Sequence, residues 1–239
     1  MKKLSVTRLT EGQEQGLNVY QLINRLLAGK EIHTPLNPGD LFLHQQRQRA
    51  IVSLLRREGF FPLPGKRILD VGCGSGKVLR EFLEFGAPHE SLIGVEIQNW
   101  RLEEAKAFTP HLPLINADGC HLPFDDDCFD LVMQFTVFSS ILDDDVRREM
   151  AAEMRRVLRP DGLLLWYDFW LNPVNPQTRG ISPAEIRALF PNCRCSFRRL
   201  TLAPPVARLL APHSWLTCYL LERLRVFNSH YLAAIRPER

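Results

Sequence analysis

The chain has 239 residues, 45% hydrophobic and 24% charged, with a net charge of only +3. These values are ordinary for a globular protein long enough to bury a large core. No apolar run reaches the ~20 residues of a membrane span, and no apolar stretch follows the first lysines as it would in a signal peptide. We therefore expect a cytoplasmic α/β protein with additions to its central domain.

The six cysteines are scattered and form no C-x-x-C pair. Cys193 and Cys195 would point to one side of a strand, which is poor geometry for a metal ion. The sequence therefore predicts reduced thiols and no metal site.

Charge is distributed unevenly along the chain. Residues 1–60 carry 9 basic and 5 acidic side chains, residues 61–170 carry 11 and 19, and residues 171–239 carry 10 and 3. If the basic flanks fold over a central cleft, their positive rim favours an anionic substrate. The alternative is an ordinary solvated surface.

Residues 1–60 are expected to form a helical extension or lid. Apolar residues at helical spacing run from Val19 to Leu27, and this helix could pack on the domain edge or cover a site. After a loop with two prolines, Asp40 is expected to cap a helix over residues 41–58, which Gly59 ends.

The segment 68–79 is the centre of the chain. It predicts a buried strand over residues 68–71, a turn with glycines at every second position, and a helix from Lys77. Such glycines permit positive φ and leave the backbone bare, so that a ligand can lie on it beside the helix N-terminus. A second apolar strand ends at Glu96, whose carboxylate could accept hydrogen bonds from two ribose hydroxyls.

From Lys66 onward, strand and helix patterns alternate, which favours a parallel sheet with right-handed crossovers. The expected strands and helices of this part lie at residues 92–96, 114–116, 129–135 and 163–169, and at 77–85, 99–108 and 144–158. A short helix capped by Ser182 follows, and strands over 195–202 and 229–236 are expected to close the sheet.

Five segments in order identify a family. The glycine turn has G-x-G-x-G spacing after Asp70, and Glu96 follows it; next come Asn116-Ala117-Asp118-Gly119, Phe129-Asp130-Leu131-Val132 and Leu158-Arg159-Pro160-Asp161-Gly162. Together they resemble the class I S-adenosylmethionine-dependent methyltransferases. The resemblance implies a Rossmann-like, doubly wound α/β sheet of seven strands, mostly parallel, with a reversed strand near the C-terminal edge. The methyltransferase domain would span residues 61–239, with a helical insertion at 203–227.

The resemblance also implies the cofactor, S-adenosylmethionine, and the residues that bind it. The glycine loop would hold the methionine portion, with Asp70 near its ammonium group. Glu96 would take the ribose, Ile97 would lie against the adenine, and Asp118 would bond the adenine amino group. The full expected set is Asp70, Gly72, Cys73, Gly74, Gly76, Glu96, Ile97, Asp118, Gly119 and Gln134.

The acceptor is less defined. In this family the helix before the first strand covers the cofactor, so His44, Gln45 and Arg47 could reach into the cleft. Methyl transfer to a hydroxyl benefits from a general base, and the candidates are His44, His121, Tyr167 and Asp168, each of which could instead be structural. The segment after the fourth strand lacks the Asn-Pro-Pro-Tyr type of motif found in enzymes that methylate base amines.

We therefore expect a methyltransferase acting on a small-molecule or glycan-like acceptor at oxygen. The alternatives are an RNA or protein methyltransferase that uses the basic flanks, and a non-catalytic subunit that binds S-adenosylmethionine. Residues 204–227 are long and apolar and predict helix. They could be an added core layer, a wall of the substrate pocket, or a patch that rests on a membrane or partner.

Overall fold

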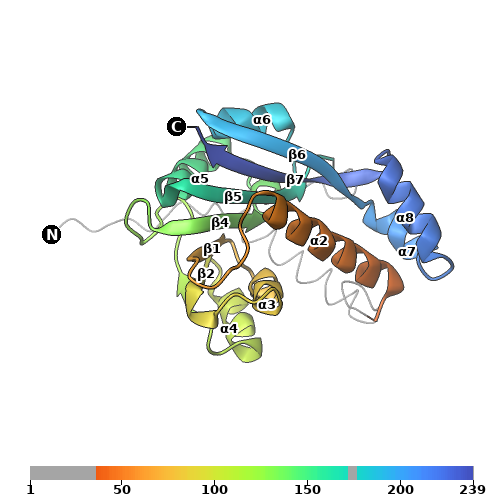
Figure 1. The fold of residues 1–239 in the computed structure, drawn as a ribbon, viewed down its shortest axis with the longest axis horizontal. Helices are drawn as coiled ribbons and strands as arrows, with labels where there is room; N and C mark the ends of the chain where they lie inside the picture. Colours follow the sequence, from red (N-terminus) through yellow and green to blue (C-terminus); the bar gives the residue numbers. More distant parts are fainter. Residues whose placement is uncertain (1–35, 172–176, 239) are drawn as a thin grey trace.

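The computed structural model describes residues 36–171 and 177–238, and within them the chain forms one seven-stranded sheet with helices on both faces (Figure 1). The strand order is β3-β2-β1-β4-β5-β7-β6. The strands are β1 (Ile68–Val71), β2 (Leu92–Glu96), β3 (Leu114–Asn116), β4 (Phe129–Phe135), β5 (Leu158–Phe169), β6 (Cys193–Leu202) and β7 (Asn228–Pro237). Strands β1 to β5 pair in parallel, and β7 runs antiparallel to both of its neighbours. The predicted fold, including the reversed strand near the C-terminal edge, is confirmed.

The helices cover the two faces of the sheet separately. They are α2 (Pro38–Arg57), α3 (Lys77–Glu84), α4 (Asn99–Phe108), α5 (Asp144–Arg156), α6 (Pro183–Leu189), α7 (Pro204–Leu210) and α8 (Trp215–Leu224), with short 3-10 turns η1 (His89–Ser91) and η2 (Phe138–Ser140). Buried residues of α2, α3 and α4 belong to the core on one face, and those of α5 and α6 to the core on the other. Because successive strand residues point to opposite faces, each strand contributes to both cores.

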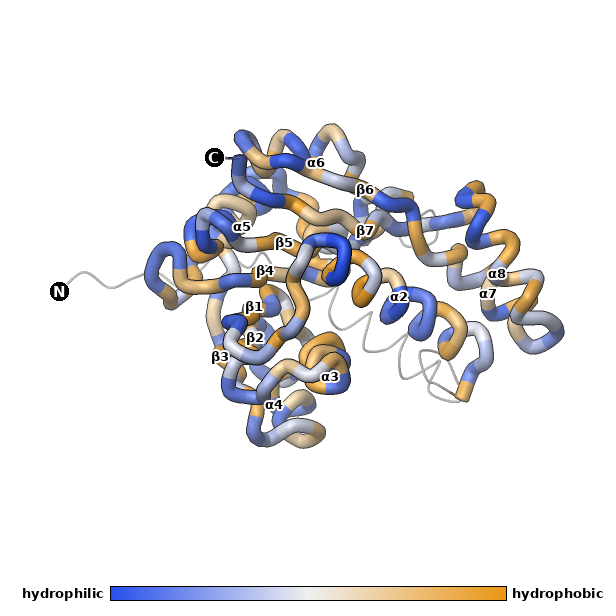
Figure 2. The backbone as a smooth tube through the Cα atoms, viewed as in Figure 1, coloured by the Kyte–Doolittle hydropathy of each residue, from blue (hydrophilic) through white to orange (hydrophobic). Residues whose placement is uncertain are grey.

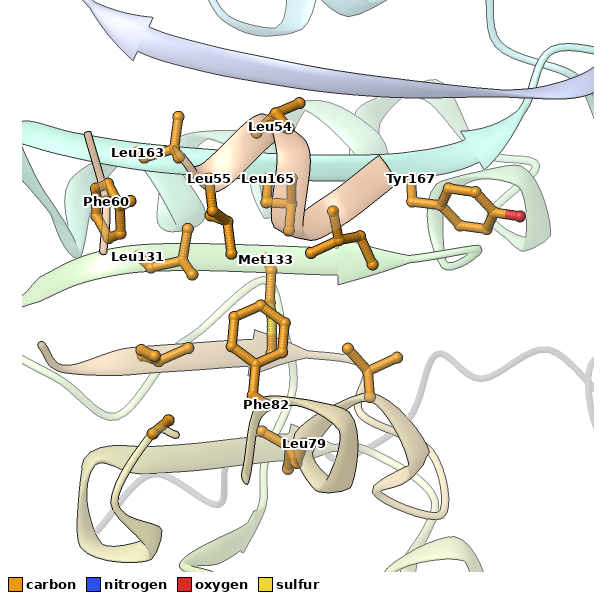
Figure 3. Packing of buried hydrophobic residues seen from close by; sticks show 14 of the residues in the cluster. Leu54, Leu55, Phe60, Leu79, Phe82, Leu131, Met133, Leu163, Leu165 and Tyr167 are labelled. Carbon is orange, nitrogen blue, oxygen red and sulfur yellow. The ribbon is translucent and has the colours of Figure 1, made fainter. Parts of the chain in front are cut away.

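Helix α2 packs directly on the centre of the sheet. Leu54 and Leu55 lie over β4 and β5, and the strand side chains on this face include Leu131, Met133 and Leu165 (Figure 3). Tyr167 follows on the same face of β5, nearer the carboxyl end of the strand. The helix therefore fixes a cover over the face on which Tyr167 lies.

The beginning of α2 differs from the expectation. Asn37, not Asp40, caps the helix: its side-chain oxygen accepts from the backbone N–H groups of Gly39 (2.9 Å) and Asp40 (3.3 Å). Pro38 occupies the first turn, where its missing N–H is not needed. Asp40 is thereby released to pair with Arg208 of α7 (2.8 Å).

One of two further segments departs from its expected form. The segment 158–162, expected as a turn, is already part of β5, which pairs with β4 through a register shift near Phe129. The apolar stretch 204–227 is helical as expected and forms two helices, α7 and α8, with α7 packed against α2 and a small core around Phe42 between them. The helix expected at 19–27 lies outside the described residues, and the division at residue 60 remains a prediction.

Candidate functional site

The glycine turn after β1 is held by the neighbouring strand. The backbone N–H groups of Gly72 and Cys73 donate to the carbonyl of Val95 on β2 at 2.8 and 3.0 Å. Gly72, Gly74 and Gly76 have φ of 75°, 54° and 71°, in the left-handed region. A residue with a side chain would be strained at these positions. Gly76 is the N-cap of α3, so the free N–H groups of that helix open toward the turn.

The bare backbone at Gly72 is not open on every side. A Cβ built there would lie 2.5 Å from a methyl carbon of Val137, which follows β4. At Gly74 the nearest side-chain atom is Nη1 of Arg101, 3.3 Å from the equivalent position. The Val137 side chain therefore occupies part of the space beside Gly72 in which a ligand was expected to lie on the bare backbone.

Two buried carboxylates stand behind this turn on the same face of the sheet. Glu96 accepts from the backbone N–H of Gly74 and of Gln98, both at 3.0 Å. Asp70 is 1% exposed, and neither of its oxygens has a hydrogen-bond partner. Burial, followed by the negative charges of Glu96 and Glu81, raises the pKa of Asp70 to about 8.

The two Asp70 oxygens without hydrogen-bond partners show whether the site is suited to S-adenosylmethionine. A buried acceptor without a donor is unfavourable, and a cationic ligand group would supply the missing partner. The ammonium of a methionine portion meets that need, and the oxygens of Glu96 keep lone pairs for hydroxyl donors. The residues present therefore fit the cofactor that the sequence implies.

The loop after β3 lies at the same edge, since β1, β2 and β3 are parallel neighbours. The side chain of Asp118 is half exposed and accepts from the backbone N–H of Cys120 (2.9 Å). Asn116, which the sequence did not single out, donates to the carbonyls of Glu96 (2.9 Å) and Ile97 (3.0 Å) and so joins the ends of β2 and β3. The Ile97 side chain, which is expected to lie against the adenine, is 45% exposed. Its surface is therefore open to solvent.

Gly119 and His121 complete this loop. A Cβ at Gly119 would meet the end of the flexible Met150 side chain. His121 lies 3.8 Å from Asp118 through its Nδ1 atom, and its side chain is 82% exposed. The His121 side chain thus pairs within its own loop and points mostly into solvent.

Helix α2 brings a charged cluster over the sheet. Arg47 donates to Glu81 of α3, and His44 Nδ1 lies 3.4 Å from the same carboxylate oxygen. The Glu81 carboxylate is buried on α3, and this burial raises its pKa. Burial, then Arg47 and Lys77, lower the pKa of His44 to about 4, so its ring is neutral at pH 7.

Aromatic rings at the ends of β4 and β5 adjoin this cluster. The Arg47 guanidinium carbon is 5.7 Å from the ring centres of both Phe135 and Tyr167. The Tyr167 hydroxyl shares a hydrogen bond with that of Thr201 (2.7 Å), and burial raises the pKa of the phenol to about 12. His230 of β7 stacks on Tyr167 at 4.6 Å.

Asp168 and Gln134 lie near the carboxyl ends of β5 and β4, on the face of the sheet opposite to Asp70 and Glu96. Asp168 follows Tyr167, so it points toward α5, where it accepts from the backbone N–H of Ser139 (3.1 Å). Burial raises its pKa to about 6. Gln134 is fully buried and accepts from the backbone N–H of Val137 (3.1 Å). Both side chains fix the backbone after β4, and Asp168 lies across the sheet from His44.

Sequence reasoning missed Glu81, Lys77 and His230. A signal existed for Glu81, because it lies three residues after Val78 and beside Phe82, on the buried stripe of α3. His230 gave none, since only the pairing of β7 with β5 sets it opposite Phe169 and beside Tyr167.

No metal-binding cluster is found in the part of the chain that the structure describes. No three His, Cys, Asp or Glu side chains there gather as metal ligands would. All six cysteines are free thiols, and burial raises the pKa of Cys73, beside the glycine turn, and that of Cys120.

Residues 68–162 match the protein family described as "Methyltransferase domain". The sterol 24-C-methyltransferase ERG6B of Gibberella zeae is 32% identical over 116 residues, 45% of this chain and 28% of the relative. The ubiquinone/menaquinone biosynthesis C-methyltransferase UbiE of Ectopseudomonas mendocina is 29% identical over 66% and 56% of the two chains. An O-methyltransferase of Pyrenophora dematioidea is 29% identical over 76% and 69%. The chain spans less than a third of the length of the first of these relatives.

Solved structures share the fold along most of the chain. A TehB-like S-adenosylmethionine-dependent methyltransferase from Corynebacterium glutamicum superposes with a TM-score of 0.57 at 16% identity, covering 95% of this chain and all of that one. The PH0226 protein of Pyrococcus horikoshii gives 0.62 at 16% identity over 90% and 99%. The family match therefore covers a methyltransferase domain at residues 68–162, less than half of the chain. The described fold is the one seen in solved S-adenosylmethionine-dependent methyltransferases.

Proposed function

We propose that the protein transfers a methyl group from S-adenosylmethionine to the oxygen of a small-molecule or glycan-like acceptor, preferably an anionic one. The observation that carries the proposal is the pair of buried carboxylates behind the glycine turn. Asp70 lacks any hydrogen-bond partner, and Glu96 is fixed by two backbone N–H groups. Asp70 would hold the ammonium group, Glu96 the ribose, and Asp118 the adenine.

The bound cofactor supplies an activated methyl group on a sulfonium, and this chain's residues supply alignment and a dry site. Leu54 and Leu55 of α2 pack against the sheet and keep the helix over Tyr167 and Phe135. This cover limits the access of water to the carboxyl ends of β4 and β5.

The charged cluster under α2 supports an anionic, hydroxylated acceptor. Arg47 and Lys77 lie close enough to lower the pKa of His44. The same positive charges would lower the pKa of an acceptor hydroxyl and stabilise its oxyanion. His44, neutral at pH 7, can accept a hydrogen bond or proton from that hydroxyl, whereas the high pKa of Tyr167 and the opposite-facing position of Asp168 disfavour both as the base.

One of the relatives named above supports oxygen as the acceptor atom. The O-methyltransferase of Pyrenophora dematioidea aligns over 194 residues, against 116 for the sterol 24-C-methyltransferase. The fold by itself does not specify a reaction, since the [4+2]-cyclase SpnF superposes with a TM-score of 0.56 at 17% identity. A subunit that binds S-adenosylmethionine without catalysis is the second candidate.

The test measures binding and turnover separately. Calorimetry with the full chain should give S-adenosylmethionine binding, and panels of hydroxylated metabolites and glycans, in anionic and neutral pairs, should reveal S-adenosylhomocysteine formation. We expect the anionic member of a pair to react faster. Binding without turnover on any panel favours the non-catalytic subunit, and absence of binding refutes the proposal.

A further inference from the structure

The outer surface of α8 is an exposed apolar face without a partner in the described residues. Leu216, Tyr219, Leu220 and Leu224 recur at helical spacing, and Phe227 follows after the helix ends; all five are 41–67% exposed, and we call them the α8 face. Residues 209–227 hold eight of the fifteen exposed large hydrophobic side chains in ranges 36–171 and 177–238. Figure 2 shows this apolar segment at the far end of the molecule from β3 and α4. Clustering of this kind marks an interaction surface.

The α8 face is not needed to hold its own helix. The opposite side of α8 buries Cys218 and Glu222, and Glu222 accepts from the backbone N–H of Thr201 (3.1 Å). Trp215, at the first turn, packs edge-to-face on Phe42 of α2 at 5.8 Å. The helix is therefore anchored from within, and its apolar outer side is available for a partner.

The charge around the face selects the partner. Glu222 is the only acidic residue between 203 and 227, and it is buried. Arg223 and Arg225 are exposed beside the apolar side chains. Apolar and aromatic side chains flanked by arginine, with no exposed carboxylate, match the interface of a bilayer that contains anionic lipids.

Two other occupants match less well. In a two-fold dimer formed through this face, the arginines of the two copies would lie near each other and repel. Residues 1–35 carry five basic and three acidic side chains, so their net positive charge does not complement Arg223 and Arg225.

We propose that the α8 face is a peripheral docking site for an anionic membrane surface. No helix in the described ranges is long and apolar enough to cross a bilayer, and docking through this face needs no crossing. The apolar side chains would enter the headgroup region while Arg223 and Arg225 contact lipid phosphates. The proposal does not depend on methyl transfer.

The test is co-sedimentation of the full chain with vesicles of neutral phosphatidylcholine, or of phosphatidylcholine with phosphatidylglycerol. We expect binding to the mixed vesicles that weakens as salt rises. The double variants Leu216→Ser/Leu220→Ser and Arg223→Glu/Arg225→Glu should each lower the partition coefficient by about tenfold or more. The matched controls Leu142→Ser/Leu171→Ser and Arg187→Glu/Arg194→Glu, which make the same changes at other exposed positions, should bind as the unaltered chain does.

Equal loss in a control pair, or no binding to the mixed vesicles, overturns the proposal. A dimer in light scattering that Leu216→Ser/Leu220→Ser dissociates would instead assign the face to a second copy. If the chain ignores vesicles and the same variant increases hydrogen exchange in residues 19–27, the N-terminal segment covers the face. Should the leucine variant fail to fold, as judged by its melting curve, the arginine pair still decides.

Discussion

The guanidinium of Arg47 on α2 donates a hydrogen bond to the carboxylate of Glu81 on α3. Both side chains are largely buried, at 17% and 4% exposed. This pair joins the covering helix to the helix that begins at the glycine turn. Because Arg47 also lies over the rings of Phe135 and Tyr167, it connects the expected cofactor site with the expected acceptor site.

Replacement of Arg47 tests that connection. Arg47→Gln removes the positive charge and should raise the KM for an anionic acceptor by about tenfold or more, with a smaller change in kcat, because an ion contact to bound substrate is lost. Steady-state kinetics with the best acceptor of the panel provides the measurement. Arg49→Gln, an exposed change on the same helix, is the control, and an unchanged KM in Arg47→Gln would contradict the role.

Removal of Glu96 tests the cofactor site. Glu96→Ala should weaken S-adenosylmethionine binding by about tenfold or more, since a charged acceptor for two hydroxyls is lost. It also leaves the N–H groups of Gly74 and Gln98 without their acceptor. Calorimetry measures the affinity, and Glu103→Ala on the exposed side of α4 is the control. Unchanged affinity would remove the assignment.

Asp70 should make stability pH-dependent. Its pKa is raised from 3.8 to about 8, so the folded chain keeps a proton that the unfolded chain releases. The stabilisation is therefore fully present below pH 3.8 and is lost as the pH rises toward 8. Denaturant unfolding across this range should show a steeper loss in the unaltered chain than in Asp70→Asn; parallel curves would contradict it.

Asp70 should also release a proton when the cofactor binds. A bound ammonium group favours the carboxylate form and lowers the raised pKa. At pH 7, calorimetry in buffers of different ionisation enthalpy should detect release of a proton fraction that Asp70→Asn lacks. A release that is the same in both proteins would place the ammonium elsewhere.

Gly39 should be intolerant of a side chain. A Cβ at this position would lie 2.5 Å from the Cα of Arg208, so α2 and α7 would have to move apart. Gly39→Ala should lower the free energy of unfolding by about 1–3 kcal/mol. Chemical denaturation measures it, with the exposed Ser53→Ala on α2 expected to change it by less than about 0.5 kcal/mol.

The strands and the glycine turn could be predicted because their signals are local. Strands β1 to β4 begin and end where apolar runs and turn residues indicated, and the alternation of strands with helices implied a parallel sheet. The position of Glu96 at the end of the second strand follows from the same pattern. These features depend on neighbours within a few residues, which the sequence displays.

Other features depend on contacts between distant segments. Asp40 pairs with Arg208, 168 residues away, instead of capping α2. The face on which Asp168 lies follows from the strand register, and Val137 meets Gly72 only because β4 pairs with β1. The sequence by itself determined a parallel α/β domain with a glycine turn and an acidic residue at the end of the next strand. Only the tertiary structure decided which charged side chains share a face, because burial and strand register are set by packing across the whole sheet.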